Sequence, residues 1–72
     1  MKIKIHYCVQ WNYEPRASSL AAEIKKELGF DCELVKSSGG AFEIYADKKI
    51  IFSKLNEDRF PDDGEVVKLL KK

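Results

Sequence analysis

The sequence has few residues that could cross-link a small protein. Among its 72 residues are two cysteines, Cys8 and Cys32, and one histidine, His6. Two cysteines are too few for a disulfide scaffold, and their spacing with His6 fits no zinc site. We therefore expect no bound metal and no bound cofactor. We also expect a single domain over residues 1–72, stabilised mainly by its hydrophobic core.

Net charge and long apolar runs are also lacking. The chain has thirteen basic and twelve acidic residues, which gives a net charge of +1. This balance gives no reason to expect nucleic acid or an acidic membrane as a partner. The first residues alternate between charged and apolar types, unlike a signal peptide, and no run approaches the ~20 residues of a membrane span. These patterns predict a cytoplasmic protein; they do not predict its oligomeric state.

Alternation of apolar and polar residues at a period of two predicts four strands. The predicted strands cover residues 2–7, 31–36, 41–46 and 49–54. The turn cluster from Ser37 to Gly40 lies between the second and third of them. It is too short for a phosphate-binding loop, but its backbone is expected to line a site at Cys8.

Apolar residues at helical spacing predict two helices. The first covers residues 15–28, with Pro15 in its first turn and Gly29 as the residue that ends it. The second follows Pro61 and carries an apolar stripe from Val66 to Leu70. The segment between the last strand and Pro61 is expected to be irregular.

The order β-α-β-β-β-α predicts an α/β protein with two layers and a thioredoxin-like topology. The first two strands would be parallel, the last two would form an antiparallel hairpin, and both helices would cover one face of a four-stranded mixed sheet. The other face would stay partly wet, since it carries Lys4, His6, Glu43 and Tyr45.

Cys8 lies where the first strand ends, before the first helix. Thiolate is the reactive form of cysteine and helix N-termini stabilise it, so Cys8 is a candidate catalytic residue. The position is also typical of a small apolar residue that is buried and inert. Cys32 is predicted to be a core residue about 15 Å away along a parallel strand. A bridge between the two is not expected, because disulfides need Cα atoms within about 7 Å.

The segment Tyr7-Cys8-x-x-Trp11-x-Tyr13-x-Pro15 resembles a motif of the Rdx family, to which selenoprotein W belongs. That family has Tyr-Cys-x-x-Sec-x-Tyr-x-Pro, or cysteine in place of selenocysteine. The resemblance continues through the whole chain, in the segments Gly40–Ile44, Ile51–Lys54, Arg59–Pro61 and Val67–Leu70. It implies a thioredoxin-like fold and thiol or selenol redox chemistry, with glutathione as a co-substrate rather than a bound cofactor.

The resemblance places Cys8 at the first reactive position and Trp11 at the second. Tryptophan cannot attack or resolve a bond to Cys8, so an internal dithiol cycle cannot run in this chain. Enzymatic turnover is therefore left open. The alternative is a non-enzymatic module that docks a partner protein through loop 9–13, with Trp11 and Tyr13 as anchors. The simplest role for Trp11 is that of a bulky residue covering the loop.

The codons offer an explanation for Trp11. Selenocysteine is specified by UGA and tryptophan by UGG, which differ in one base. We hypothesise that the natural residue at position 11 is selenocysteine and that tryptophan is a replacement or a misreading. We expect sequencing of the native gene to find UGA at this codon; an ordinary UGG rules the hypothesis out.

Overall fold

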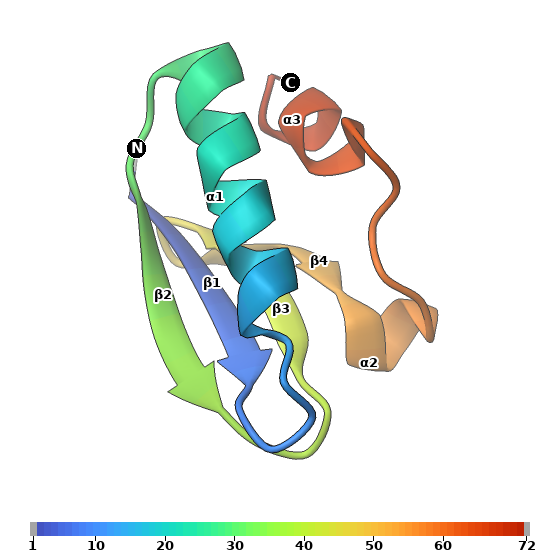
Figure 1. Ribbon diagram of the computed structural model, residues 1–72. Helices are drawn as coiled ribbons and strands as arrows, with labels where there is room; N and C mark the ends of the chain where they lie inside the picture. The colour runs from blue at the N-terminus through green and yellow to red at the C-terminus, as the bar shows by residue number, and fades with distance from the viewer. Residues whose placement is uncertain (1, 72) are drawn as a thin grey trace.

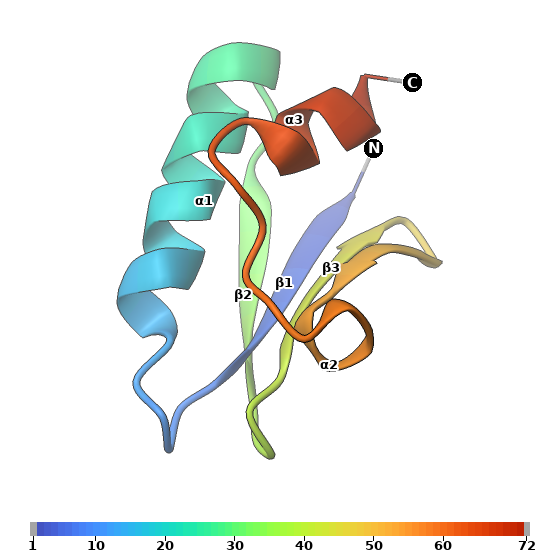
Figure 2. The ribbon, with the colours of Figure 1, turned by 90° about the vertical axis from the view of Figure 1, so that its right-hand side faces the viewer.

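Four strands form one mixed sheet, and two helices cover one of its faces (Figures 1 and 2). The computed structural model describes residues 2–71. Its elements are β1 (Ile3–Cys8), α1 (Glu14–Leu28), β2 (Cys32–Ser37), β3 (Phe42–Ala46), β4 (Lys49–Ser53), α2 (Lys54–Glu57) and α3 (Glu65–Leu70). The predicted α/β fold with a four-stranded mixed sheet is confirmed.

The strands lie in the order β2-β1-β3-β4, so β1 is central. It pairs in parallel with β2, with Ile3 opposite Cys32 and Cys8 opposite Ser37. It pairs antiparallel with β3, which in turn pairs antiparallel with β4. A strand, a crossover helix and a parallel strand followed by a hairpin is the arrangement that the sequence predicted.

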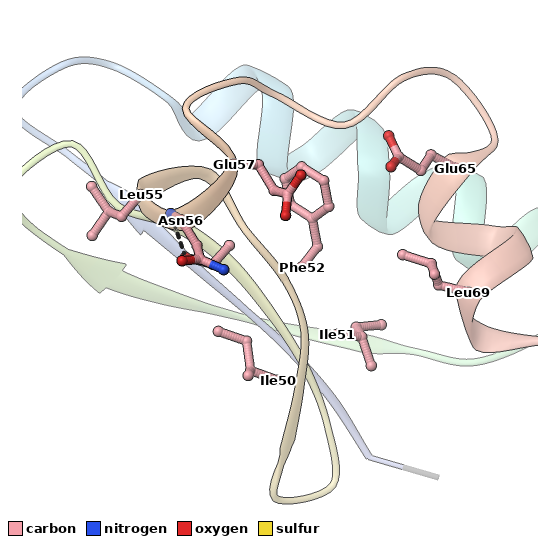
Figure 3. Close-up of a pocket in the computed structure, with 9 residues that line it drawn as sticks. Ile50, Ile51, Phe52, Leu55, Asn56, Glu57, Glu65 and Leu69 are labelled. Carbon is pink, nitrogen blue, oxygen red and sulfur yellow. Dashed lines mark hydrogen bonds between the residues drawn. The ribbon is translucent and has the colours of Figure 1, made fainter.

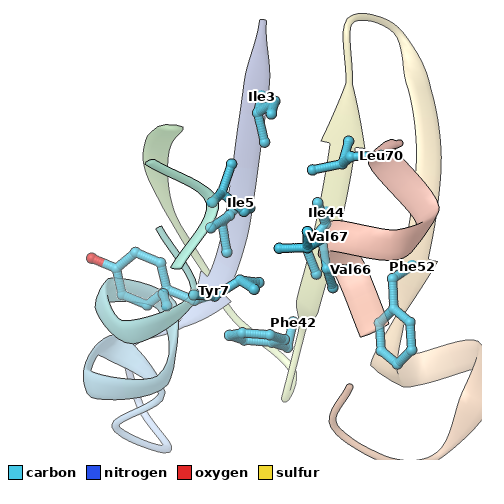
Figure 4. Close-up of a cluster of buried hydrophobic side chains, with 12 residues drawn as sticks. Ile3, Ile5, Tyr7, Phe42, Ile44, Phe52, Val66, Val67 and Leu70 are labelled. Atoms are coloured by element: carbon cyan, nitrogen blue, oxygen red, sulfur yellow. The ribbon is translucent and has the colours of Figure 1, made fainter. Parts of the chain in front are cut away.

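The core lies between the sheet and the pair α1 and α3 (Figure 4). Alternate residues of β1 point into it because side chains of a strand alternate between its faces. It consists of Ile3, Ile5, Tyr7, Ala17, Leu20, Ile24, Phe42, Ile44, Phe52, Val66, Val67 and Leu70. Figures 1 and 2 both show α3 beside the C-terminal half of α1, far from the loop that follows β1.

The opposite face of the sheet is polar and partly exposed, as expected. Lys4, His6, Glu43 and Tyr45 are all half-buried there. The rings of His6 and Tyr45 lie 4.8 Å apart between centroids. The Ser53 hydroxyl donates a hydrogen bond to the Glu43 carboxylate across the β3–β4 ladder. His6 thus occupies the sheet position that its alternation predicted.

Helix α1 begins and ends almost where the sequence indicated. It starts at Glu14, with Pro15 in the first turn, where the missing N–H of proline costs no hydrogen bond. Gly29 ends it in the left-handed conformation, with φ of 78°, and its N–H donates to the Lys25 carbonyl. The Tyr7 hydroxyl donates to the Glu14 carboxylate at 3.4 Å and so links β1 to the start of this helix.

The region after β4 was predicted incorrectly in two respects. Residues 54–57 form the short helix α2, so residues 2–71 contain seven elements rather than six, and β4 ends one residue earlier. The Ser53 side chain caps α2 by accepting a hydrogen bond from the Asn56 N–H. Such a local cap leaves no apolar periodicity in the sequence, and α2 buries no residue.

Helix α3 begins at Glu65, four residues after Pro61, so it starts later than the sequence predicted. The Arg59 guanidinium donates two hydrogen bonds of 2.8 Å to the Glu65 carboxylate, which also accepts one from the Asp62 N–H. The hydrogen bonds from Arg59, with help from the Asp62 amide, lower the pKa of Glu65 to about 2. This pair stabilises the 59–65 segment above pH ~4.5, and the contribution is lost as pH falls through the folded pKa.

The β3–β4 ladder shifts between Ile44 and Tyr45, which leaves Ile51 as the extra residue of a β-bulge. Among residues 2–71, none of the helices has the length and apolar character that crossing a bilayer requires.

Candidate functional site

Cys8 is the last residue of the central strand and lies between two loops, 9–13 and 38–41. Its backbone N–H donates to the Ala41 carbonyl at 2.8 Å, and its carbonyl accepts from the Tyr13 N–H at 3.2 Å. The Val9 N–H donates to the Ser37 carbonyl at 3.3 Å. Both loops are therefore tied to the strand end that carries the thiol.

Burial and backbone amides act on the Cys8 thiol in opposite directions. Burial of the side chain, the largest single influence, raises the pKa of the Cys8 thiol. Hydrogen bonds from the backbone N–H groups of Gly40, Trp11 and Gln10 together outweigh burial and bring this pKa below its ordinary value. Such donors stabilise the thiolate, because hydrogen bonds to the charged form of a group favour that form.

The source of this stabilisation differs from the sequence expectation. The sequence suggested the N-terminus of the following helix, but α1 begins only at Glu14. The amides that lower the pKa of Cys8 belong instead to the two loops. The sequence predicted that the backbone of the turn from Ser37 to Gly40 would line a site at Cys8, and the Gly40 amide is indeed one of these donors. Gln10 was missed because it acts through the backbone alone. The turn cluster before β3 was the only signal for Gly40.

Trp11 contributes to the site in two ways. Its backbone N–H reaches the Cys8 sulfur, and its indole lies against Gly40 of the other loop. Gly40 has φ of +77°, and a Cβ atom added there would lie 3.0 Å from Trp11 Cζ3. Only glycine combines this backbone conformation with such a close approach. Trp11 thus bridges the two loops, although its side chain remains 60% exposed.

A cluster of aromatic rings packs against loop 9–13. The Tyr13 ring packs edge-on against Trp11, with centroids 6.0 Å apart, and against Phe60 at 4.8 Å. Phe60 in turn contacts the buried Phe42 at 5.2 Å and carries the Arg16 guanidinium 4.1 Å above its ring. Loop 9–13 is therefore anchored to the core and to the segment before α3.

Cys32 has a different environment. It lies opposite Ile3 at the start of β2, whereas Cys8 lies opposite Ser37 at the other end of the pair. Both cysteines are free, so the prediction that they do not bridge is confirmed. Burial, followed by the negative charge of Asp31, raises the pKa of Cys32. The two thiols are therefore shifted in opposite directions, and only Cys8 is favoured as a thiolate.

The Cys8 side chain has no exposed surface in this arrangement. A reagent can therefore reach the Cys8 sulfur only if the chain around it moves. Within residues 2–71, no three His, Cys, Asp or Glu side chains lie close enough together to hold a metal ion. The chemistry that this arrangement can offer is that of a single buried thiol whose pKa is lowered by backbone amides.

Residues 2–72 match the model of the Rdx family. The chain belongs to the Rdx family. Its resemblance to that family, first seen in the Tyr7–Pro15 motif, thus extends over nearly every residue. A crystal structure of a selenoprotein W-related protein from Vibrio cholerae superposes with a TM-score of 0.84 at 27% identity, covering 97% of this chain and 91% of that one. A crystal structure from Bordetella parapertussis gives a TM-score of 0.92 at 25% identity, covering 97% and 92%.

Two curated relatives are longer Rdx-like proteins named migration and invasion enhancer 1. The Bos taurus protein is 27% identical over 73 residues, which cover 100% of this chain and 64% of that protein. The Mus musculus protein is 30% identical over 71 residues, which cover 97% and 62%. This Rdx chain thus spans slightly less than two thirds of the length of these relatives.

The contact between Trp11 and Gly40 gives a testable prediction. Gly40→Ala and Gly39→Ala both place alanine at a positive φ, and this strain should cost each about 1 kcal/mol of unfolding free energy in chemical denaturation. Gly40→Ala should cost more than Gly39→Ala, because its Cβ also displaces the Trp11 indole. Only Gly40→Ala forces Trp11 away, and only this variant should raise the pKa of Cys8, measured by thiolate absorbance in a Cys32→Ser background.

Gly39 is the matched control because a Cβ added there meets nothing within 4 Å. The double variant Gly40→Ala/Trp11→Ala removes the close contact and should recover part of the lost stability. Equal pKa values of Cys8 in the two alanine variants would contradict the role given to this contact.

Proposed function

We propose that this Rdx protein is a small monothiol redox protein in which Cys8 exchanges disulfides with glutathione. The observation that carries the proposal is the set of three backbone amides that lower the pKa of Cys8. A lowered pKa increases the thiolate fraction near neutral pH, and thiolate is the nucleophile in disulfide exchange. The proposal also places this chemistry in the cytoplasm, where glutathione is the main thiol buffer.

The proposed reaction has two exchange steps. The Cys8 thiolate attacks one sulfur of an oxidised substrate R–S–S–G, forms a Cys8–S–S–G mixed disulfide and releases R–S⁻, which takes up a proton. A glutathione thiolate then attacks the glutathione sulfur of the mixed disulfide. This step releases glutathione disulfide and restores the Cys8 thiolate. In sum, R–S–S–G and one free glutathione give R–SH and glutathione disulfide, so one glutathione thiol is oxidised for each substrate sulfur that is reduced.

Position 11 determines which resolving step is available. A thiol or selenol at position 11 would be three residues from Cys8 in the sequence and could resolve a mixed disulfide within the same chain. With Trp11, the resolving group has to come from solution. In a natural protein with selenocysteine at this position, the selenolate would attack the substrate first and Cys8 or glutathione would resolve the product.

The alternative is a docking module without redox activity. Val9 and Trp11 are 45% and 60% exposed, large exposures for apolar side chains on one short loop. Tryptophan is enriched among residues that dominate binding energy at interfaces. Under this alternative, Cys8 would be an inert, buried residue, and loop 9–13 would bind a partner protein.

Titration of Cys8 separates the two candidates. In a Cys32→Ser background, thiolate absorbance should give a pKa of Cys8 below the ~8.5 of a free thiol. Mass spectrometry should find one glutathione per chain after treatment with glutathione disulfide, and none in Cys8→Ser. An ordinary pKa with no mixed disulfide would exclude the redox proposal and favour docking.

The same shift has a consequence for stability. A lowered folded pKa stabilises the fold fully above the pKa of the unfolded thiol, ~8.5, and this contribution disappears as pH falls through the folded pKa. Unfolding free energy should therefore rise across this window in the Cys32→Ser background. The rise should be absent when Cys8 is also replaced by serine.

Restoring a second thiol tests the role of position 11. Trp11→Cys should form a disulfide with Cys8 and speed glutathione-dependent disulfide reduction by at least about tenfold, because an internal thiol acts at high effective concentration. Trp11→Ser removes the indole without adding a thiol and should show no such gain. Equal rates in the two variants would show that the missing second thiol does not limit the reaction.

A further inference from the structure

Strand β4 is an open edge of the sheet. It pairs with β3 on one side, and within residues 2–71 no strand covers its other side. Exposed edge strands offer unpaired N–H and C=O groups to another strand. Two of the large apolar residues that remain exposed, Ile50 at 44% and Leu55 at 60%, lie in or directly after β4. The edge is thus both apolar and free to pair.

A groove of about 630 Å³ runs along this edge between α2 and α3 (Figure 3). Its apolar lining comes from Ile50, Ile51, Phe52, Leu55 and Leu69, and its polar rim from Ser53, Asn56, Glu57 and Glu65. Figure 3 shows Ile50 and Leu55 on one side of β4 and Ile51 and Leu69 on the other. A strand added here would therefore meet apolar side chains on both of its faces.

Charge along the edge changes sign from one end to the other. Lys48 and Lys49 precede the apolar residues, are exposed, and form no ion pair within the described residues 2–71. Glu57 follows them and has only a 3.9 Å contact with Arg59. Lys54 lies between these ends, but its Nζ is directed over the rings of Tyr13 and Phe60 and does not line the groove.

We propose that the occupant of this edge is a second copy of the chain, with the two β4 strands paired antiparallel about a twofold axis. With Ile51 opposite its own copy, Lys49 lies opposite Ser53 of the second copy, whose Glu57 follows one helical turn later. The basic start of each strand thus meets the acidic end of the other, twice per dimer. Such self-complementarity is what a twofold interface requires.

The dimer would have a continuous eight-stranded sheet with the helices of both copies on one face. The contact consists of one short strand and its flanking groove, and the bulge at Ile51 limits the regular pairing. Interfaces of this size are at the weak end, so dissociation constants between roughly micromolar and millimolar are expected. Cys8 takes no part in this contact, so the inference is independent of the redox proposal.

Sedimentation over increasing protein concentration, with reductant present, tests the dimer. The mass should rise from 8.3 kDa toward twice that value, and high salt should weaken the association. In NMR spectra, the backbone amides that shift with concentration should be those of residues 49–53. Ile50→Lys should abolish dimerisation, because a central lysine opposes edge pairing.

Charge reversal distinguishes this geometry from other modes of association. Lys49→Glu and Glu57→Lys should each weaken the dimer roughly tenfold, because like charges would then face each other twice. Mixing the two variants should form a heterodimer, and combining both substitutions in one chain should restore the homodimer. Lys26→Glu and Glu27→Lys, on the exposed side of α1, are matched controls and should have no effect.

Several results would overturn the proposal. They are a mass of one chain at all concentrations, a dimer that disperses with reductant, a dimer insensitive to the β4 substitutions, and a monomer whose β4 edge binds an extended segment of another protein. Charge-swapped variants that fail to associate on mixing would exclude the antiparallel arrangement.

Discussion

The hydrogen bond from the Cys8 amide to the Ala41 carbonyl is the contact on which the site depends. It fixes the point at which β1 stops pairing with β3, and the chain on both sides then turns into loops. These two loops carry Gly40, Gln10 and Trp11, whose backbone amides lower the pKa of Cys8. Alternate side chains of β1 pack against α1 in the core and hold this end of the strand in place. The environment of the thiol therefore depends on the packing of the core.

The pattern of apolar residues predicted those elements of the fold that form by burying one face. The four strands, α1 and the position of Cys8 at the end of the central strand all followed from side-chain alternation and helical spacing. The patterning could not predict α2 or the start of α3, because capping by Ser53 and the Arg59–Glu65 pair decide them. The turn residues from Ser37 to Gly40 indicated that backbone lines the Cys8 site, but not which amides lower the pKa of Cys8, since their positions depend on backbone angles such as the positive φ of Gly40.

The difference between side-chain and backbone contributions explains how this member of the Rdx family can depart from the family motif at the second reactive position. The groups that stabilise a thiolate at Cys8 are backbone N–H groups, including that of Trp11 itself. A change of side chain at position 11 removes a reactive atom but leaves the donor in place. The acidity of the first thiol and the presence of the second are therefore separable properties of this fold.

Trp11 is the only tryptophan of the chain, and its indole rests on the glycine whose amide contacts Cys8. Indole emission depends strongly on polarity and on nearby quenching groups, so the intrinsic fluorescence of the protein originates almost entirely at its candidate site. Loop opening, oxidation of the sulfur or attachment of an adduct would each change that emission. The molecule therefore carries its own optical probe, and events at Cys8 can be followed in real time without a dye.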